Sequence, residues 1–125
     1  MDKKIMLVDD DPIFNWVSSK MIHMVDAGLK IDIYQNARKA LDFLVDNFDQ
    51  GGHYIIFLDL NMPEMSGWEF LEALENNDYS RNESISVYIV SSSTDQDDIE
   101  KSKTYPLVKG YLIKPLSLDV LQSIM

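Results

Sequence analysis

The sequence predicts an α/β fold, a doubly wound parallel sheet of five strands with helices on both faces. Five short apolar runs alternate with segments whose apolar residues recur at helical spacing. Strand–helix repeats of this kind are joined by right-handed crossovers, which make the strands parallel. One run, residues 54–60 (YIIFLDL), is almost continuously apolar, as expected of a strand covered on both faces. With 125 residues, 46% of them hydrophobic, residues 1–125 are expected to form one domain with its own core.

The first strand is predicted at residues 4–8 (KIMLV), a short apolar run that ends at three acidic residues. A helix is expected to follow, with Asp11 as its N-cap and Pro12 at its first position. Ala27-Gly28 is expected to end this helix. Its predicted apolar face consists of Phe14, Val17, Met21 and Met24.

The middle of the chain predicts two further strands and two helices. Residues 29–35 alternate apolar and polar side chains, as in a half-buried strand. Asn36 is expected to cap a helix that runs through Asn47. After the strand at 54–60, Ser66 and Glu69 have the spacing of a capping box at the start of another helix. Apolar positions at helical spacing in these two helices are Ala37, Ala40, Leu41, Leu44, Phe48, Phe70, Leu71 and Leu74.

The last third of the chain repeats the pattern. A fourth strand is predicted at residues 86–91 (SVYIVS) and a polar, weakly amphipathic helix at 94–103. A fifth strand is predicted at 110–114 (GYLIK), and residues 116–125 are expected to form the last helix. These elements complete five strand–helix repeats.

Charge and composition exclude several classes of function. The formal net charge of −10 would repel a phosphate backbone, so the chain is not expected to bind nucleic acid by itself. No apolar run is long enough to cross a bilayer, and no membrane association is expected. The chain has no cysteine, which excludes disulfides and thiolate metal sites and is typical of a cytoplasmic protein.

Polar side chains gather at the carboxyl ends of the predicted strands, where parallel sheets bind ligands. They are Asp9, Asp10, Asp59, Ser91 and Lys114. If the first and third strands are neighbours, repulsion among three carboxylates raises their pKa values unless a cation lies between them. An all-oxygen donor set favours Mg²⁺ before Mn²⁺. With a lysine for an anion and a hydroxyl donor, these side chains can place a phosphoryl group on Asp59.

Four motifs in this order resemble those of the receiver domain of bacterial two-component response regulators. They are LVDDDP, LDLNMPEMSG, VSSS and YLIKP, and the resemblance extends from Lys4 to the final helix. It implies a flavodoxin-like sheet with strand order 2-1-3-4-5. It also implies that Asp59 accepts a phosphoryl group from a phosphohistidine of a sensor histidine kinase or a phosphotransfer protein.

The resemblance assigns the remaining site residues by position. Asp10, Asp59 and the backbone carbonyl of Asn61 would bind Mg²⁺ directly, and Asp9 would act through water. Lys114 would pair with Asp59 and then with the phosphoryl oxygens, and the peptide bond from Lys114 to Pro115 would be cis. Such a domain is not an enzyme for separate substrates, because it catalyses only its own phosphorylation and dephosphorylation.

The resemblance also implies a switch. The hydroxyl of Ser91 would move to the phosphoryl group, and Tyr111 would swing inward and remodel the face formed by the fourth helix, fifth strand and fifth helix. A downstream protein would bind this face, and the domain would be a monomer or a phosphorylation-linked dimer. We expect a stand-alone receiver without a DNA-binding output domain, in preference to a piece of a longer regulator.

Three other hypotheses for the function are compared with the sequence below. A phosphatase of the haloacid-dehalogenase type uses an aspartate nucleophile with a second aspartate two residues later, but Leu60-Asn61 follows Asp59 here. A flavin or nucleotide carrier requires a hydroxyl- or glycine-rich loop after the first strand, where this chain has DDDPIF. A pseudo-receiver that signals without phosphorylation is disfavoured by the complete set of acidic residues.

Overall fold

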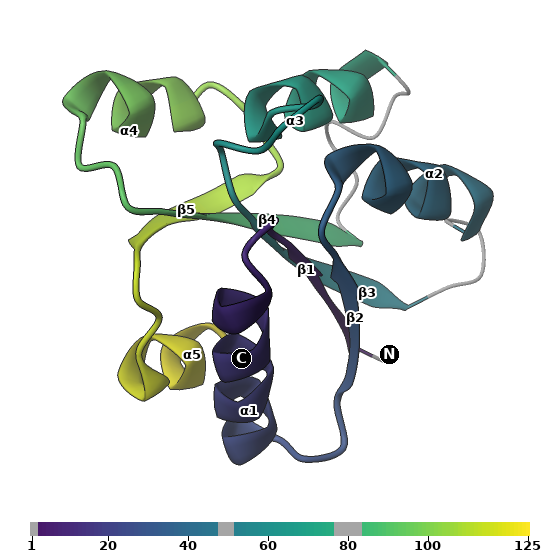
Figure 1. Cartoon of the computed structure of the whole chain (residues 1–125), viewed down its shortest axis with the longest axis vertical. Helices are drawn as coiled ribbons and strands as arrows, with labels where there is room; N and C mark the ends of the chain where they lie inside the picture. The colour runs from purple at the N-terminus through teal and green to yellow at the C-terminus, as the bar shows by residue number, and fades with distance from the viewer. Residues whose placement is uncertain (1–2, 48–51, 77–83) are drawn as a thin grey trace.

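A computed structural model describes residues 3–47, 52–76 and 84–125, and its strands form one parallel sheet in the order β2-β1-β3-β4-β5. The predicted fold class and strand order are therefore confirmed (Figure 1). The strands are β1 (Lys3–Val8), β2 (Lys30–Tyr34), β3 (His53–Leu58), β4 (Ile85–Ser91) and β5 (Val108–Ile113). The helices are α1 (Pro12–Val25), α2 (Ala37–Asn47), α3 (Gly67–Asn76), α4 (Gln96–Ser102) and α5 (Leu118–Ile124).

The helices cover the sheet from both sides. Figure 1 shows α1 and α5 on one face, and α2, α3 and α4 on the other. Successive residues of a strand point to opposite faces, so Ile5 belongs to the core under α1 and α5 while Met6 belongs to the core under α2 and α3. This two-sided burial explains why β1 and β3 read as continuous apolar runs. Within the described ranges, no helix is both long and apolar enough to cross a membrane.

Local hydrogen bonds confirm the predicted starts of α1 and α3. Asp11 Oδ1 accepts bonds from the backbone N–H groups of Ile13 (2.9 Å) and Phe14 (3.3 Å), so Asp11 is the N-cap of α1. Ser66 and Glu69 form the predicted capping box. The backbone N–H of Ser66 donates to Glu69 Oε1 at 3.0 Å, and the backbone N–H of Glu69 donates to Ser66 Oγ at 3.2 Å. Helices α4 and α5 begin later than the predicted residues 94 and 116. Their N-caps are Asp95 and Ser117, so the helices start at Gln96 and Leu118.

The predicted buried face of α1 is wrong at two positions. Val17 is 43% exposed and Met24 is 71% exposed, whereas the buried residues of α1 are Asn15, Ser18 and Ile22. The side-chain amide of Asn15 donates to the carbonyl of Asp9 at 2.8 Å, which turns this polar residue toward the sheet and Met24 toward solvent. Helix α1 also ends at Val25, before the predicted Ala27-Gly28 stop. The predicted apolar position Phe48 lies outside the described residues.

Candidate functional site

The register of the sheet brings Asp9 and Asp59 together. Strands β1 and β3 are parallel neighbours, and Val8 pairs with Leu58 at their carboxyl ends. The next residue of each strand is therefore an aspartate at the same edge of the sheet. The backbone N–H of Asp59 donates to the carbonyl of Val8 at 2.9 Å, so this position is held by the sheet itself.

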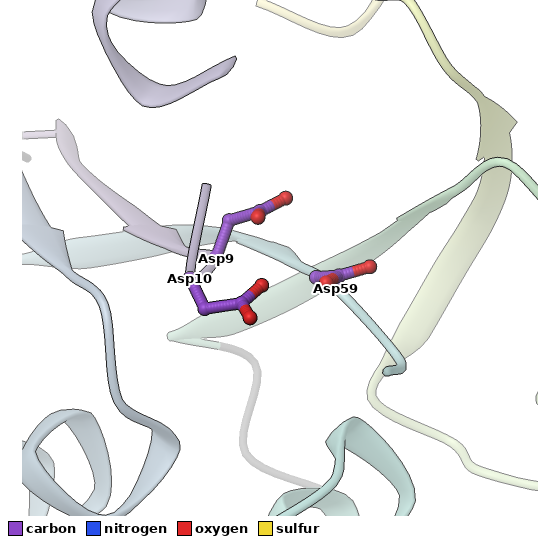
Figure 2. Close-up of side chains that lie close together, drawn as sticks. All are labelled: Asp9, Asp10 and Asp59. Atoms are coloured by element: carbon purple, nitrogen blue, oxygen red, sulfur yellow. The ribbon is translucent and has the colours of Figure 1, made fainter. Parts of the chain in front are cut away.

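Asp9, Asp10 and Asp59 form one acidic cluster, shown in Figure 2. Each contributes a carboxylate oxygen, and these oxygens lie within 4.8 Å of one another. Asp9 and Asp59 are buried, with 2% and 7% of their surface exposed, whereas Asp10 is exposed. Two buried acids with an exposed third leave the cluster open toward solvent on one side.

Lys114 supplies the cation nearest to this cluster among the described residues. Its backbone N–H donates to the carbonyl of Ser91 at 2.9 Å, which fixes it at the end of β5 beside β4. Its ammonium lies 2.8 Å from Asp9 Oδ2 and 3.6 Å from Asp59 Oδ1. The peptide bond from Lys114 to Pro115 is cis. The short contact with Asp9 was not predicted from the sequence.

The surroundings of Asp59 shift its ionisation. Burial, followed by the charge of Asp9, raises the pKa of Asp59 to about 6, while Lys114 acts in the opposite direction. The pKa of Lys114 is also raised: burial lowers it, but the hydrogen bond to Asp9 and the charge of Asp59 outweigh that effect. Asp59 thus carries negative charge that its neighbours do not fully neutralise.

The cluster fits a hard divalent cation. Its donors are carboxylate oxygens, the ligands that Mg²⁺ prefers, and the raised pKa of Asp59 indicates a place where positive charge is favourable. Asp9 already uses both of its oxygens, because Oδ1 accepts from the Asp11 N–H at 2.9 Å and Oδ2 pairs with Lys114. Asp59 also accepts a hydrogen bond from the backbone N–H of Asn61.

Ser91 and Tyr111 meet at a third residue, Ser93. The buried hydroxyl of Ser91 accepts a bond from the N–H of Ser93 at 3.0 Å. The hydroxyl of Tyr111, a half-buried residue of β5, donates to the carbonyl of Ser93 at 3.0 Å. The hydroxyl of Ser93 donates to Asp98 Oδ2 in α4, also at 3.0 Å. Ser93 therefore links β4, β5 and α4, a role that the sequence analysis missed.

This fold and acidic edge define a class of signalling domain, and comparison with known proteins gives the family. The sequence matches the response regulator receiver domain family over residues 5–125, and the chain belongs to this family. It is therefore a receiver domain of two-component signal transduction, a family in which phosphorylation and magnesium binding are general features. Family membership disfavours the phosphatase and nucleotide-carrier readings.

Individual relatives support the same conclusion. The transcriptional regulatory protein MalR of Bacillus subtilis is 30% identical over 121 residues, covering 95% of this chain and 47% of MalR. The chain thus spans about half the length of that relative. A two-component response regulator from Cytophaga hutchinsonii superimposes with a TM-score of 0.87 at 27% identity, over 98% of this chain and 93% of that one. The Mn²⁺-bound form of response regulator Rcp1 superimposes with a TM-score of 0.71 at 27% identity, over 98% and 91%.

Proposed function

We propose that residues 1–125 act as one receiver domain in which Asp59 accepts a phosphoryl group in a Mg²⁺-dependent reaction. The observation that carries the proposal is the meeting of three carboxylates and one lysine at a single edge of the sheet. The donor is a phosphohistidine on a sensor histidine kinase or a phosphotransfer protein. The domain catalyses only its own phosphorylation and dephosphorylation, so it is a phosphoacceptor rather than an ordinary enzyme.

The chain's own residues carry out the transfer. An ionised oxygen of Asp59 attacks the phosphorus, the P–N bond to the donor imidazole breaks, and its electron pair stays on that nitrogen. With a pKa of about 6, Asp59 is mostly ionised near neutral pH. Lys114, whose ammonium lies 3.6 Å from Asp59 Oδ1, would pair with a phosphoryl oxygen, and the hydroxyl of Ser91, at the end of the neighbouring strand β4, would donate to another. Hydrolysis of the acyl phosphate by water returns inorganic phosphate and the free carboxylate.

The acidic residues would hold the metal. Asp10, Asp59 and the backbone carbonyl of Asn61 would bind Mg²⁺ directly, and Asp9, whose oxygens already have partners, would act through water. The bound ion would neutralise charge shared by the carboxylates and the phosphoryl oxygens. The Rcp1 structure that superimposes on this chain is the Mn²⁺-bound form of that protein, which supports Mn²⁺ as a substitute here.

The conformational effect of phosphorylation would be transmitted to the protein surface through Ser93. When the hydroxyl of Ser91 turns to a phosphoryl oxygen, it leaves the N–H of Ser93, whose carbonyl holds Tyr111. The face formed by α4, β5 and α5 then changes shape by a shift between two packings. A hollow of about 340 Å³ on this face, lined by Tyr111, Ile113 and Val120 among others, supports it as the surface for a downstream protein or a second phosphorylated copy.

Intact-mass spectrometry tests the proposed acceptor. The protein is incubated with acetyl phosphate, with Mg²⁺ or with EDTA, alongside Asp59→Asn and a control, Asp42→Asn, that changes an exposed aspartate of α2. We expect one added phosphoryl group in wild type and the control, and none in Asp59→Asn or in EDTA. A phosphoryl group on Asp59→Asn, or equal uptake in EDTA, would contradict the proposal. Wild type without any adduct would contradict it too, once a phosphorylated histidine kinase also fails as donor.

A further inference from the structure

The ammonium of Lys114 is enclosed by an aromatic ring as well as by two carboxylates. It lies 4.4 Å from the centre of the Phe14 ring, in addition to its contacts with Asp9 and Asp59. Phe14 belongs to the first helical turn of α1, whereas Lys114 follows β5. The contact therefore joins two segments that are far apart in the sequence, at the edge of the sheet where the acidic cluster lies.

The backbone holds Phe14 in this place. Asp11 caps α1 and accepts a hydrogen bond from the N–H of Phe14, which fixes the first turn. One residue later, Asn15 is tied to the carbonyl of Asp9 at 2.8 Å. The Phe14 ring also packs against the core under α1 and α5 and is only partly exposed. A ring fixed on both sides in this way has little freedom to leave Lys114.

The ring has two physical effects on Lys114. Its negative face attracts the ammonium, and its bulk keeps water from that side of the cation. A lysine stem is long and flexible, so without a fixed neighbour the ammonium samples many positions. We propose that Phe14 is a positioning residue that holds the Lys114 ammonium between Asp9 and Asp59, where a phosphoryl oxygen on Asp59 will meet it. The positioning role of Phe14 rests on the proposed function in one respect, namely that Asp59 is the residue that accepts the phosphoryl group.

A rate measurement tests the positioning role. Phe14→Leu keeps an apolar side chain but removes the ring face, whereas Phe14→Tyr keeps the ring. The control is Trp16→Leu, which removes an exposed ring of the same helix that contacts Lys20 at 5.5 Å instead. With acetyl phosphate and Mg²⁺, we expect Phe14→Leu to slow phosphorylation roughly three- to tenfold, because a partly desolvated cation–π contact is lost. Phe14→Tyr and Trp16→Leu should stay close to the wild-type rate.

A double-mutant comparison separates positioning from packing. In a Lys114→Gln background, Phe14→Leu should have no further effect on the residual rate, because there is no ammonium left to hold. A packing defect would slow both backgrounds equally and would show as a lower urea midpoint. The proposal is overturned if Phe14→Leu reacts at the wild-type rate, if Phe14→Tyr slows as much as Phe14→Leu, or if the loss persists without Lys114.

Proton NMR gives a readout that does not depend on phosphorylation. The Lys114 side-chain protons beside the amine lie near the face of the ring, so their resonances should be shifted upfield in wild type and Phe14→Tyr and not in Phe14→Leu. If wild type takes up no phosphoryl group, the proposed function fails, and this measurement alone decides whether Phe14 holds Lys114. Identical Lys114 shifts in wild type and Phe14→Leu would overturn the positioning role.

Discussion

Lys114 lies closer to Asp9 than to Asp59, at 2.8 Å from Asp9 Oδ2 and 3.6 Å from Asp59 Oδ1. Lys114 therefore does not fully neutralise Asp59, and burial together with the charge of Asp9 keeps the pKa of Asp59 raised, at about 6. Asp59 is held ready to accept a further positive charge or an electrophile. This arrangement lowers the free energy of unfolding, because a charged Asp59 is less favourable in the folded chain than in the unfolded one.

Asp59→Asn should stabilise the metal-free protein at neutral pH. Because the pKa of Asp59 is higher in the folded chain than its ordinary value of 3.8, folding favours the protonated form, and the free energy of unfolding falls as pH rises through about 4 to 6. After a discount for solvent screening, we expect Asp59→Asn to raise the free energy of unfolding by about 1 to 2 kcal/mol at pH 7.5 and by almost nothing near pH 3.5. Urea unfolding in EDTA at the two pH values measures the difference.

The matched control for this pH experiment is Asp42→Asn, which changes an exposed aspartate on α2. Its effect on stability should be small and nearly the same at both pH values. If Asp59→Asn stabilised the protein equally at both pH values, the charge of Asp59 would not be the cause of the stabilisation.

Mg²⁺ should make wild type more stable than Asp59→Asn, the reverse of the order without metal. An ion that binds only the folded protein adds about 2.7 kcal/mol to the free energy of unfolding at 100 times its dissociation constant. Wild type should therefore gain stability with Mg²⁺, while Asp59→Asn and Asp10→Asn, which each lose a proposed ligand, should gain much less. Thermal unfolding across a Mg²⁺ titration measures this gain, with Ca²⁺ and Mn²⁺ in parallel. Equal gains in wild type and Asp10→Asn would exclude Asp10 as a ligand.

Much of the fold and the position of the site were predictable because they depend on simple patterns. Strands covered on both faces have continuous apolar sequences, and the carboxyl ends of the strands indicate the positions of Asp9, Asp59 and Lys114. The cap at Asp11 was predictable because the geometry of a helix start requires a particular side chain at a particular place.

What could not be predicted depends on where side chains point. The periodicity of α1 counts apolar residues only, so it missed Asn15, which a hydrogen bond to the backbone of Asp9 draws inward. The sequence also contains no signal that Lys114 lies nearest Asp9, that Phe14 stacks on it, or that Ser93 joins Ser91 to Tyr111. Each of these contacts joins side chains whose directions are set by packing across several elements.

Gly67→Ala should damage the acceptor position. A Cβ atom at Gly67 would lie 2.9 Å from the Cα of Leu60 and still closer to the carbonyl oxygen of Asp59, so the backbone itself would have to move. We expect a loss of roughly 2 to 3 kcal/mol in the free energy of unfolding, and slower phosphorylation of Asp59. Gly28→Ala is the control, because its Cβ would meet only Asp26 Oδ1 at 3.5 Å, an ordinary contact. Urea unfolding that failed to separate the two variants would contradict this prediction.

Glu64→Gly should stabilise the loop between Asp59 and α3. Glu64 has a φ angle of 69°, in the left-handed region that costs an ordinary residue about 1 to 2 kcal/mol and glycine almost nothing. The exposed bond from Asn36 Nδ2 to Glu64 Oε2, at 3.2 Å, offsets only part of that cost. Allowing for the greater entropy of glycine in the unfolded chain, we expect Glu64→Gly to raise the free energy of unfolding by about 0.5 to 1 kcal/mol. Glu64→Ala is the matched variant, because it loses the same bond but keeps the Cβ atom, and it should bring no gain. If urea unfolding showed equal stability for the two variants, the backbone conformation at Glu64 would not be the source of the strain.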